Sequence, residues 1–316
     1  MQIEELVLLT VLAGGSGSIK LVRGLSSVTK DFVVVCNVAD NIWLYGLYIC
    51  PDIDTIVYGL SNMLDLERGW GVKQDSFEFL RQLELLGEEA WFRIGDKDLA
   101  VHMLRSKMLK TGKSLLEITQ WISSRFGVST KIIPATDNYL ETRIVTEEGE
   151  MHLQEFWIKR NANGKVKDVI YSGANNARPT LEVLDAIKSS SMIIFAPANP
   201  VSSIGPILAI KGIRDTLTKV KSKCIAISPV IGKKPISGPA AKYMQALGIE
   251  VSPYGVARFY SDVISRFVIH TSDGHFASKI ENLGIKVYDT NIIMKDRKDE
   301  SRLASYLLGL QKSVYY

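Results

Sequence analysis

Short, continuously apolar runs recur along the chain and alternate with longer amphipathic stretches. Strands buried on both faces of a parallel sheet have this pattern, because neither face meets water. A glycine turn and an apolar helix over 18–25 follow the first run, as at the start of a doubly wound sheet. The runs predict strands at Leu6–Leu12, Phe32–Cys36, Met192–Ala196, Cys224–Ser228, Phe267–Thr271 and Ile285–Thr290, and a closing helix over 300–310.

The middle of the chain has a different period. Between residues 56 and 126, apolar side chains recur every three or four positions and glycines end the segments, which predicts helices over 75–92, 98–112 and 114–127. From 131 to 170 apolar and polar residues alternate, and the EEGE segment at 147–150 is typical of a hairpin turn. We therefore expect an insertion of helices followed by a β-hairpin.

The predicted fold class is α/β, with a doubly wound, mostly parallel Rossmann-like sheet and a helical plus β-hairpin insertion. Residues 1–60 and 186–316 are expected to form a nucleotide- or phosphate-binding core. Residues 61–185 are expected to form the inserted subdomain.

Composition excludes several classes of protein. The 316 residues carry a net charge of only +4, without a basic stripe, so nucleic acid is not an expected partner. The three cysteines form no CxxC pair and the four histidines are scattered, which argues against a zinc site or a disulfide scaffold. An acidic start, MQIEEL, and an apolar run of eight residues do not resemble a signal or a membrane span. We expect a cytoplasmic protein with no membrane partner.

The glycine turn AGGSGSIK is the first candidate site. Glycines between a strand and a helix let backbone N–H groups approach an anion, and the helix start adds positive potential. The register matches neither the dinucleotide fingerprint, which needs glycine at position 20, nor the P-loop. A tight turn without a ligand is the alternative. The candidate phosphate-binding residues are Gly14, Gly15, Ser16, Gly17, Ser18 and Lys20.

Three acids follow the second strand, where ligands gather in open α/β sheets. Asp40, Asp52 and Asp54 are candidate Mg²⁺ ligands, because Mg²⁺ takes carboxylates together with phosphate oxygens. In an extended loop, Asp52 and Asp54 would lie on one side. The alternative is that these residues make turns and cap a helix that begins near Thr55.

The segment RIGDKDLAVHMLRS, 93–106, adds charged groups ahead of a helix. Asp96 or Asp98 is expected to cap that helix, and His102 is expected to be structural. Arg93 could present its planar fork to a phosphate or a polar ring.

Two later loops, 196–206 and 228–239, follow buried strands and combine hydroxyl or amide donors with Gly and Pro. Facing the glycine turn along one sheet edge, they favour a nucleotide cleft over simple connections. Their candidate contacts are Asn199, Ser202, Ser203, Gly205, Ser228 and Gly232.

The ordered segments AGGSGSIKLVRGL, NVADNIWLYGLYICPDIDT, ERGWGVKQDSF, RIGDKDLAVHMLRS, PANPVSSIGP and SPVIGKKPISGPAAKYM resemble the 2-phospho-L-lactate transferase family over residues 6 to about 275. That family acts in making the deazaflavin coenzyme of methanogens, other archaea and actinobacteria, so an archaeal source is expected. The resemblance implies Mg²⁺ and a homodimer.

The implied reaction moves a phospholactyl group from lactyl-2-diphospho-5′-guanosine to the ribityl hydroxyl of the deazaflavin Fo, with release of GMP. The family pattern places acceptor-binding residues at Asp54 and Arg93. An enolpyruvyl or glyceryl donor is an open alternative.

Two departures from the family pattern matter. Serines replace threonines in the glycine turn, and the family's acidic NTxDD segment is here Asn37-Val38-Ala39-Asp40-Asn41. The base that takes the hydroxyl proton is therefore Asp54 or Asp40. The flat acceptor needs an apolar slot, for which Trp43, Trp70 and Tyr45 are candidates, with core packing as the alternative.

Two rival functions remain at this point. A sister family with the same fold contains sugar-nucleotide-binding metabolic regulators that transfer nothing, but these lack the PDIDT arrangement. An NAD-dependent oxidoreductase is disfavoured, because the dinucleotide fingerprint is missing.

Overall fold

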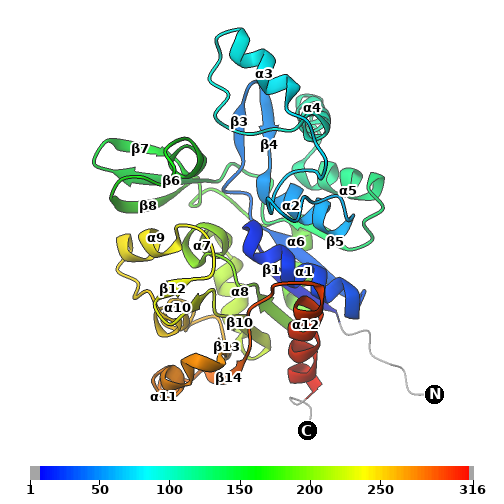
Figure 1. The fold of residues 1–316 in the computed structure, drawn as a ribbon. Coiled ribbons are helices and arrows are strands. Elements are labelled where there is room, and N and C mark those ends of the chain that lie inside the picture. Colours follow the sequence, from blue (N-terminus) through cyan, green and yellow to red (C-terminus); the bar gives the residue numbers. More distant parts are fainter. Residues whose placement is uncertain (1–7, 313–316) are drawn as a thin grey trace, which may run out of the picture.

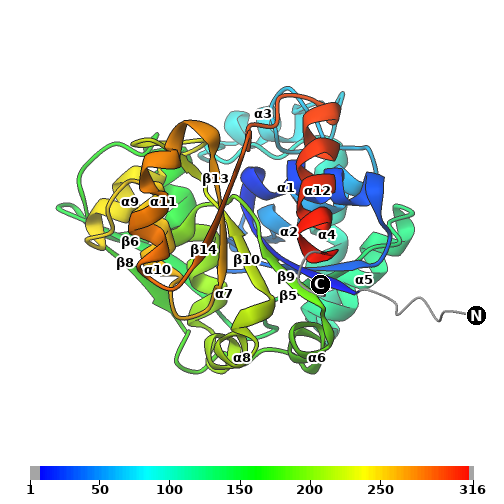
Figure 2. The ribbon, with the colours of Figure 1, turned by 90° about the horizontal axis from the view of Figure 1, so that it is seen from below.

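A computed structural model describes residues 8–312, which form a seven-stranded parallel sheet with helices on both faces (Figures 1 and 2). Every residue of β1, β2, β9 and β10 is buried, as their apolar sequences predict. The α/β prediction is confirmed. The sheet order is β14 (Lys286–Thr290), β13 (Arg266–His270), β10 (Cys224–Ile227), β9 (Met192–Phe195), β1 (Leu9–Ala13), β2 (Phe32–Cys36) and β5 (Lys131–Pro134). The predicted start of the first strand, residues 6 and 7, lies outside the described residues.

The sheet reverses its winding beside β1. The chain passes outward through β2 to β5 and then returns to β9 on the other side of β1. Ala13 pairs with Cys36, and Leu12 with Phe195, so three strands end together at this reversal. Such a switch point is where open α/β sheets place their ligands.

Helices cover both faces of the sheet. Helices α1 (Gly15–Val28) and α12 (Arg297–Lys312) pack together on one face, whereas α6 (Leu181–Ser189) and α8 (Ile213–Lys219) lie on the other (Figure 2). The remaining helices of the later half are α7 (Gly205–Ala209), α9 (Ala240–Ala246), α10 (Pro253–Phe259) and α11 (Ala277–Glu281). Short helical turns are η2 (Pro200–Ile204), η3 (Lys221–Lys223) and η4 (Thr271–Phe276), and a small hairpin is made by β11 (Val230–Ile231) and β12 (Lys234–Pro235).

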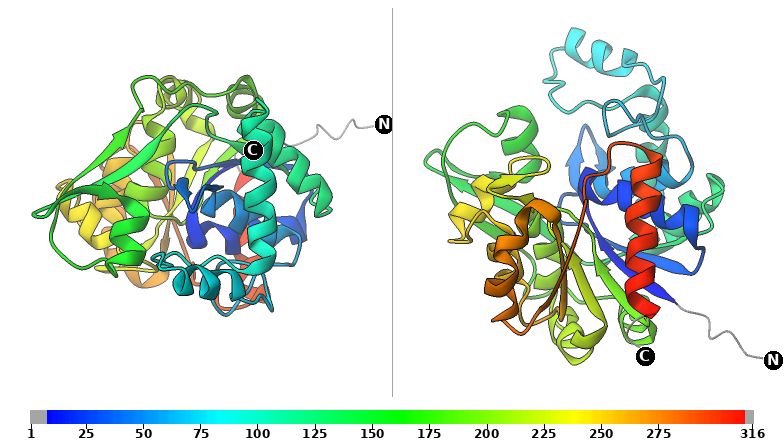
Figure 3. Two further views of the ribbon diagram at one scale, coloured as in Figure 1. Left: turned by 90° about the horizontal axis from the view of Figure 1, so that it is seen from above. Right: turned by 60° about the horizontal axis from the view of Figure 1, so that its bottom comes forward.

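The middle of the chain builds over the carboxyl edge of the sheet (Figure 3). It contains α2 (Pro51–Leu60), α3 (Glu78–Leu85), α4 (Asp96–Lys110) and α5 (Leu115–Arg125), with the hairpin of β3 (Ile42–Leu44) and β4 (Leu47–Ile49). The helix predicted over 75–92 is shorter, because only 78–85 is helical. Asp96 explains where α3 begins, since its carboxylate accepts from the N–H groups of Glu78 (3.0 Å) and Phe79 (2.9 Å).

A three-stranded antiparallel sheet completes this region. It consists of β6 (Glu141–Thr146), β7 (Gly149–His152) and β8 (Val166–Ser172), with the π-helical turn η1 (Glu155–Lys159) after β7. Thr146 pairs with Gly149, so the hairpin turns at 147–148, within the predicted segment. Residues 131–134, expected in the insertion, instead form the edge strand β5 of the central sheet. The division into a core and an inserted subdomain stays a prediction. Within residues 8–312 no helix has the length and apolar character to cross a membrane.

Candidate active site

The glycine turn is closely packed from three sides. Gly15 has φ +68°, and a Cβ on Gly14 would lie 2.9 Å from Asn37 Cβ and 2.9 Å from Asp52 Oδ2. A Cβ on Gly17 would lie 2.7 Å from the carbonyl oxygen of Pro197. These approaches require glycine. The turn therefore brings the loops that follow β1, β2 and β9 into contact.

Asp40 and Asp52 form a buried carboxylate pair beside this turn. Asn37 Nδ2 donates to both, at 3.1 Å to Asp40 Oδ1 and 2.9 Å to Asp52 Oδ2. The Gly15 N–H also donates to Asp52 Oδ1 at 2.6 Å. Burial raises the pKa of Asp52 to about 6, although these hydrogen bonds oppose the rise. Burial and the neighbouring charge of Asp52 raise the pKa of Asp40 well above its usual range.

Asp54 does not lie with Asp52, contrary to the expectation that both occupy one side of an extended loop. Pro51 begins α2 earlier than predicted, so both acids stand in its first turn. Side chains two positions apart on a helix point in different directions. Asp52 turns to the glycine turn, whereas Asp54 turns to α4. This separates the predicted three-acid metal site into a pair and a single acid.

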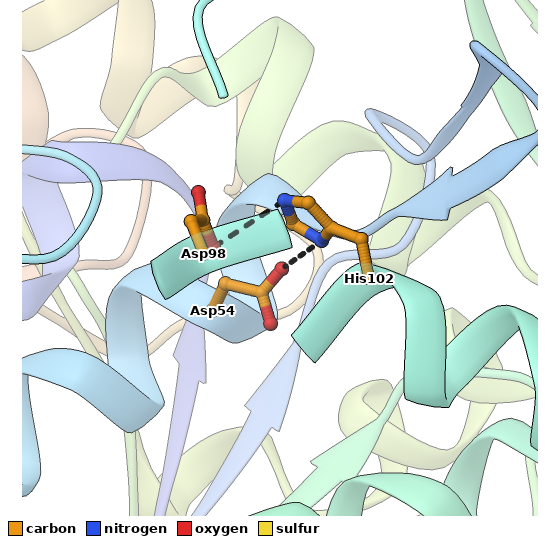
Figure 4. A group of neighbouring side chains, drawn as sticks. All are labelled: Asp54, Asp98 and His102. Carbon is orange, nitrogen blue, oxygen red and sulfur yellow. Dashed lines mark ion pairs between the residues drawn. The ribbon is translucent and has the colours of Figure 1, made fainter. Parts of the chain in front are cut away.

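Asp54 belongs to a buried network with residues of α4 (Figure 4). Arg105 donates to both of its oxygens, with 3.0 Å from Nη1 to Oδ2 and a second contact from Nη2 to Oδ1. His102 lies between two carboxylates, with Nδ1 3.6 Å from Asp54 Oδ2 and Nε2 3.3 Å from Asp98 Oδ1. The Tyr58 hydroxyl donates to Asp98 at 2.5 Å.

Charge in this network is balanced by close pairing. Burial raises the pKa of Asp54, and the charges of Arg105 and His102 oppose that rise. Burial alone would raise the pKa of Asp98, but His102 and the Tyr58 hydroxyl outweigh it and the pKa is lowered. Because Arg105 is itself buried, removing either partner would leave an unpaired charge in the interior.

A cavity of about 400 Å³ at the switch point is lined by four residues of this network: Asp54, Tyr58, Asp98 and His102. Asp40, Asp52 and Asp54 lie in its wall with Gly15 and Ser16. The same wall contains two arginines, two tryptophans and two further polar groups from α4: Arg68, Arg93, Trp70, Trp157, Asp98 and His102. A cavity of this size, with aromatic rings on its wall and charged groups beside them, suits a planar small molecule that carries a polar chain. We call it the acid cavity.

A second cavity, of about 410 Å³, adjoins the first. Ser16, Arg68 and Gly69 line both. Its other walls come from the start of α1, from the segments 64–67 and 292–295, and from the loops after β9 and β10 through Pro197, Ile236 and Ser237. We call it the α1 cavity.

The structure places several predicted residues at this site and others elsewhere. Trp70, Arg93, Gly15, Ser16 and the three acids line the acid cavity. Trp43 does not: its ring is 53% exposed, is tilted against Tyr48 at 5.0 Å, and lines a separate cavity. The Tyr45 hydroxyl donates to the carbonyl of Glu89 at 2.8 Å. Lys20 lies in the α1 cavity, where Nζ donates to the Met294 carbonyl at 2.8 Å.

The loop after β9 packs on the glycine turn, but many of its polar groups are engaged locally. Asn199 accepts from the N–H groups of Val201 and Ser202 and so begins η2. A Cβ on Gly15 would be 3.4 Å from Ser203 Oγ, which places Ser203 beside the turn. Gly205 packs under Tyr171, whose hydroxyl oxygen would lie 2.2 Å from an added Cβ. Ser18 Oγ donates to the Gly14 carbonyl at 2.8 Å.

The loop after β10 is further from the acids. Ser228 Oγ donates to the carbonyl of Val230 at 2.6 Å, and the Gly232 N–H donates to Asp273. Neither residue lines the acid cavity. Their nucleotide-binding role stays a prediction.

The residue set fits Mg²⁺ at Asp40 and Asp52. Two buried carboxylates share a single amide donor from Asn37, so negative charge at this point has no cationic partner among the described side chains. Hard oxygen ligands of this kind suit Mg²⁺. Asp54, Asp98 and His102 also lie close enough to hold a metal ion. However, Arg105 already occupies the Asp54 oxygens, and a second cation there would repel its guanidinium.

Sequence reasoning missed Asp98, His102 and Arg105 as site residues. Their spacing of four and three residues places them on one face of α4, and that signal was present in the sequence. Their partner Asp54 lies 51 positions from Arg105 in the chain, so only the fold shows what they surround. The prediction of a structural histidine at 102 stays untested.

The fold is a Rossmann-like α/β fold, and its candidate site lies at the switch point of the sheet. Residues 9–303 match the family 2-phospho-L-lactate transferase CofD. The chain belongs to this family and is a transferase.

Relatives cover nearly the whole chain. A 2-phospho-L-lactate transferase of Methanocaldococcus jannaschii is 38% identical over 95% of this chain and 97% of its own length. One from Methanosarcina acetivorans is 36% identical over 96% of this chain and 99% of its own. A phosphoenolpyruvate transferase of Streptomyces griseus is 34% identical over 97% of this chain and 99% of its own length. A crystal structure of a UPF0052-family protein from Bacillus halodurans has the same fold, with a TM-score of 0.66 and 18% identity over 96% of this chain and 98% of its own.

Proposed function

We propose that the chain transfers a phospholactyl group from lactyl-2-diphospho-5′-guanosine to the ribityl hydroxyl of the deazaflavin Fo. The hydroxyl oxygen bonds to the phosphorus that carries the lactyl group. The bond from that phosphorus to the bridging oxygen breaks, and GMP leaves with the electron pair. The product is the deazaflavin coenzyme without its glutamate tail.

The acid cavity is the observation that carries this proposal. Its volume of about 400 Å³ and its tryptophans at 70 and 157 suit a flat tricyclic acceptor. Because Asp54 is held on two oxygens by Arg105, its carboxylate is fixed and can orient the acceptor hydroxyl. Arg93 stacks on Phe77, with its guanidinium carbon 4.9 Å from the ring centre, and presents its donors to the acceptor.

Asp40 and Asp52 would hold Mg²⁺ beside the glycine turn. The bound ion would neutralise charge on the phosphate oxygens. Asp54 or Asp40 would take the hydroxyl proton late in the transfer. The protein's own part is mainly positioning, with Asn37 keeping both acids in place.

The test is product formation by the purified protein with Fo, Mg²⁺ and one of three donors, carrying a lactyl, enolpyruvyl or glyceryl group. We expect GMP and the phospholactyl product to appear together, detected by liquid chromatography with mass spectrometry. Preference for the enolpyruvyl donor would place the chain with the Streptomyces relative in donor choice. No GMP from any donor would contradict the proposal.

Two further expectations can be tested on the same preparation. Chelation with EDTA is expected to abolish turnover, and added Mg²⁺ to restore it. Light scattering is expected to give the mass of a dimer. A monomer that remains fully active would refute the expected homodimer without affecting the reaction.

A further inference from the structure

The two cavities meet at one side chain with a positive charge. Arg68 lines both the acid cavity and the α1 cavity, together with Ser16 and Gly69. It lies in the segment 61–77 between α2 and α3, a loop closed by the bridge between Leu64 and Val72. Arg68 therefore lies in the wall that the two neighbouring cavities share.

The guanidinium of Arg68 is held in place from several directions. Its carbon lies 5.0 Å from the ring centre of Trp70 and 5.2 Å from that of Phe77. Nη2 lies 2.9 Å from Asp65 Oδ2 and donates to the carbonyl of Val72 at 2.8 Å. Nε is buried and has no hydrogen-bond partner among the described residues. The stacking and the two Nη2 contacts fix the guanidinium plane in the wall that the two cavities share.

The charges of the acid cavity require a cation for any bound diphosphate. Its wall contains the carboxylates of Asp40, Asp52 and Asp54, which repel phosphate. The wall also contains Arg68 and Arg93, and the guanidinium groups of both stack on the ring of Phe77. Arg93 lines only the acid cavity, whereas Arg68 also lines the α1 cavity. The two arginines are thus placed for different parts of an extended donor–acceptor pair.

We propose that Arg68 binds the diphosphate of the donor at the junction of the two cavities, so that the transferred end faces the acids. The proposal rests on the proposed function for the identity of the donor. It assigns Arg68 to the donor and leaves Arg93 with the acceptor. Arginine suits this place, since its charge is permanent and its planar head stacks on Trp70 and Phe77 while it meets a phosphate oxygen.

The test compares binding of two probes by four variants. GDP with Mg²⁺ is titrated by calorimetry and Fo by fluorescence, using Arg68→Gln, Arg68→Lys, Arg93→Gln and the matched control Arg81→Gln. Arg81 is exposed, pairs with Glu78 on α3 and lines none of these cavities. We expect Arg68→Gln to weaken GDP about tenfold or more and Arg68→Lys to weaken it less, because charge remains but the stacked planar head is lost. Fo binding should stay close to that of the wild type in both.

Arg93→Gln is expected to weaken Fo binding and to leave GDP binding close to that of the wild type. Arg81→Gln is expected to change the binding of neither GDP nor Fo. A thermal melt accompanies each variant. If Arg68→Gln fails to fold, Arg68→Lys decides, since it keeps the charge in the loop. GDP binding equal to wild type in both Arg68 variants would overturn the proposal, as would a wild-type protein that binds no GDP. Wild-type protein that binds GDP through Arg68 but forms no product would refute the proposed function and leave this inference standing.

Discussion

The carboxylate of Asp52 accepts a hydrogen bond from the backbone N–H of Gly15, with 2.6 Å between Oδ1 and N. This contact joins the start of α2 to the start of α1, where the helix N-terminus favours a negative charge. An acid of the chain therefore stands where a phosphate would otherwise be expected. Under the proposed function, a metal ion held by Asp52 would lie beside the glycine turn and would meet the donor's phosphates there.

Asp52→Asn is therefore expected to lower turnover by about tenfold or more, since a neutral amide is a poorer Mg²⁺ ligand. The variant should also need more Mg²⁺ for half-maximal activity. Turnover measured over a range of Mg²⁺ concentrations checks this. Asp31→Asn, at an exposed position before β2, serves as the control. Unchanged Mg²⁺ dependence in Asp52→Asn would remove Asp52 from the metal site.

The buried pair of Arg105 and Asp54 leads to a second prediction. Arg105→Met is expected to destabilise the fold by about 3–5 kcal/mol, because it leaves the Asp54 carboxylate unpaired in the interior. Adding Asp54→Asn should recover part of that loss, since the unpaired charge is then gone. Urea unfolding of both variants measures the difference. The prediction fails if the double variant is no more stable than Arg105→Met alone.

Helices α1 and α12 touch at Gly24, which gives a third prediction. A Cβ at Gly24 would lie 2.3 Å from the carbonyl oxygen of Glu300. Gly24→Ala must push the helices apart and is expected to cost about 1–3 kcal/mol of unfolding free energy. Gly309→Ala, in the same pair of helices, meets nothing within 4 Å. It should stabilise by up to about 1 kcal/mol through helix propensity. Equal effects of the two substitutions on urea unfolding would contradict the packing argument.

How far the sequence leads can be seen at particular residues. The strand 32–36 follows from its own composition, because a run of Phe, Val and Cys is buried on both faces wherever it lies. The direction in which the Asp54 side chain points does not follow from its neighbours in the sequence. It depends on Pro51, which begins α2, and on Arg105 from another helix. The position of the Lys20 ammonium likewise depends on the Met294 carbonyl, 274 positions away, to which Nζ donates. Composition predicts elements, whereas long-range partners decide which side chains face the cavity.

His152 leads to a prediction on pH dependence. It ends β7, is buried, and its Nε2 lies 3.2 Å from the Asn41 carbonyl, so it ties the three-stranded sheet to the loop after β2. Burial lowers its pKa below the usual value, although Glu141 opposes the shift. The folded protein then binds this proton less readily than the unfolded chain. The contribution of His152 to stability is therefore complete above the unfolded pKa and is lost as pH falls from there through the lower folded pKa.

Histidine titrates over roughly pH 5 to 7.5. Between these two pH values we expect wild-type protein to lose more unfolding free energy than His152→Gln does, because glutamine cannot take up the proton. Urea unfolding at the two pH values gives the four free energies required. The relevant quantity is the difference between the two pH-dependent losses, so any constant cost of the substitution cancels. His275→Gln removes a histidine outside the three-stranded sheet, where the ring packs against Phe276, and is the matched control. A wild-type protein and a His152→Gln variant with the same dependence on pH would show that burial of His152 does not limit its protonation.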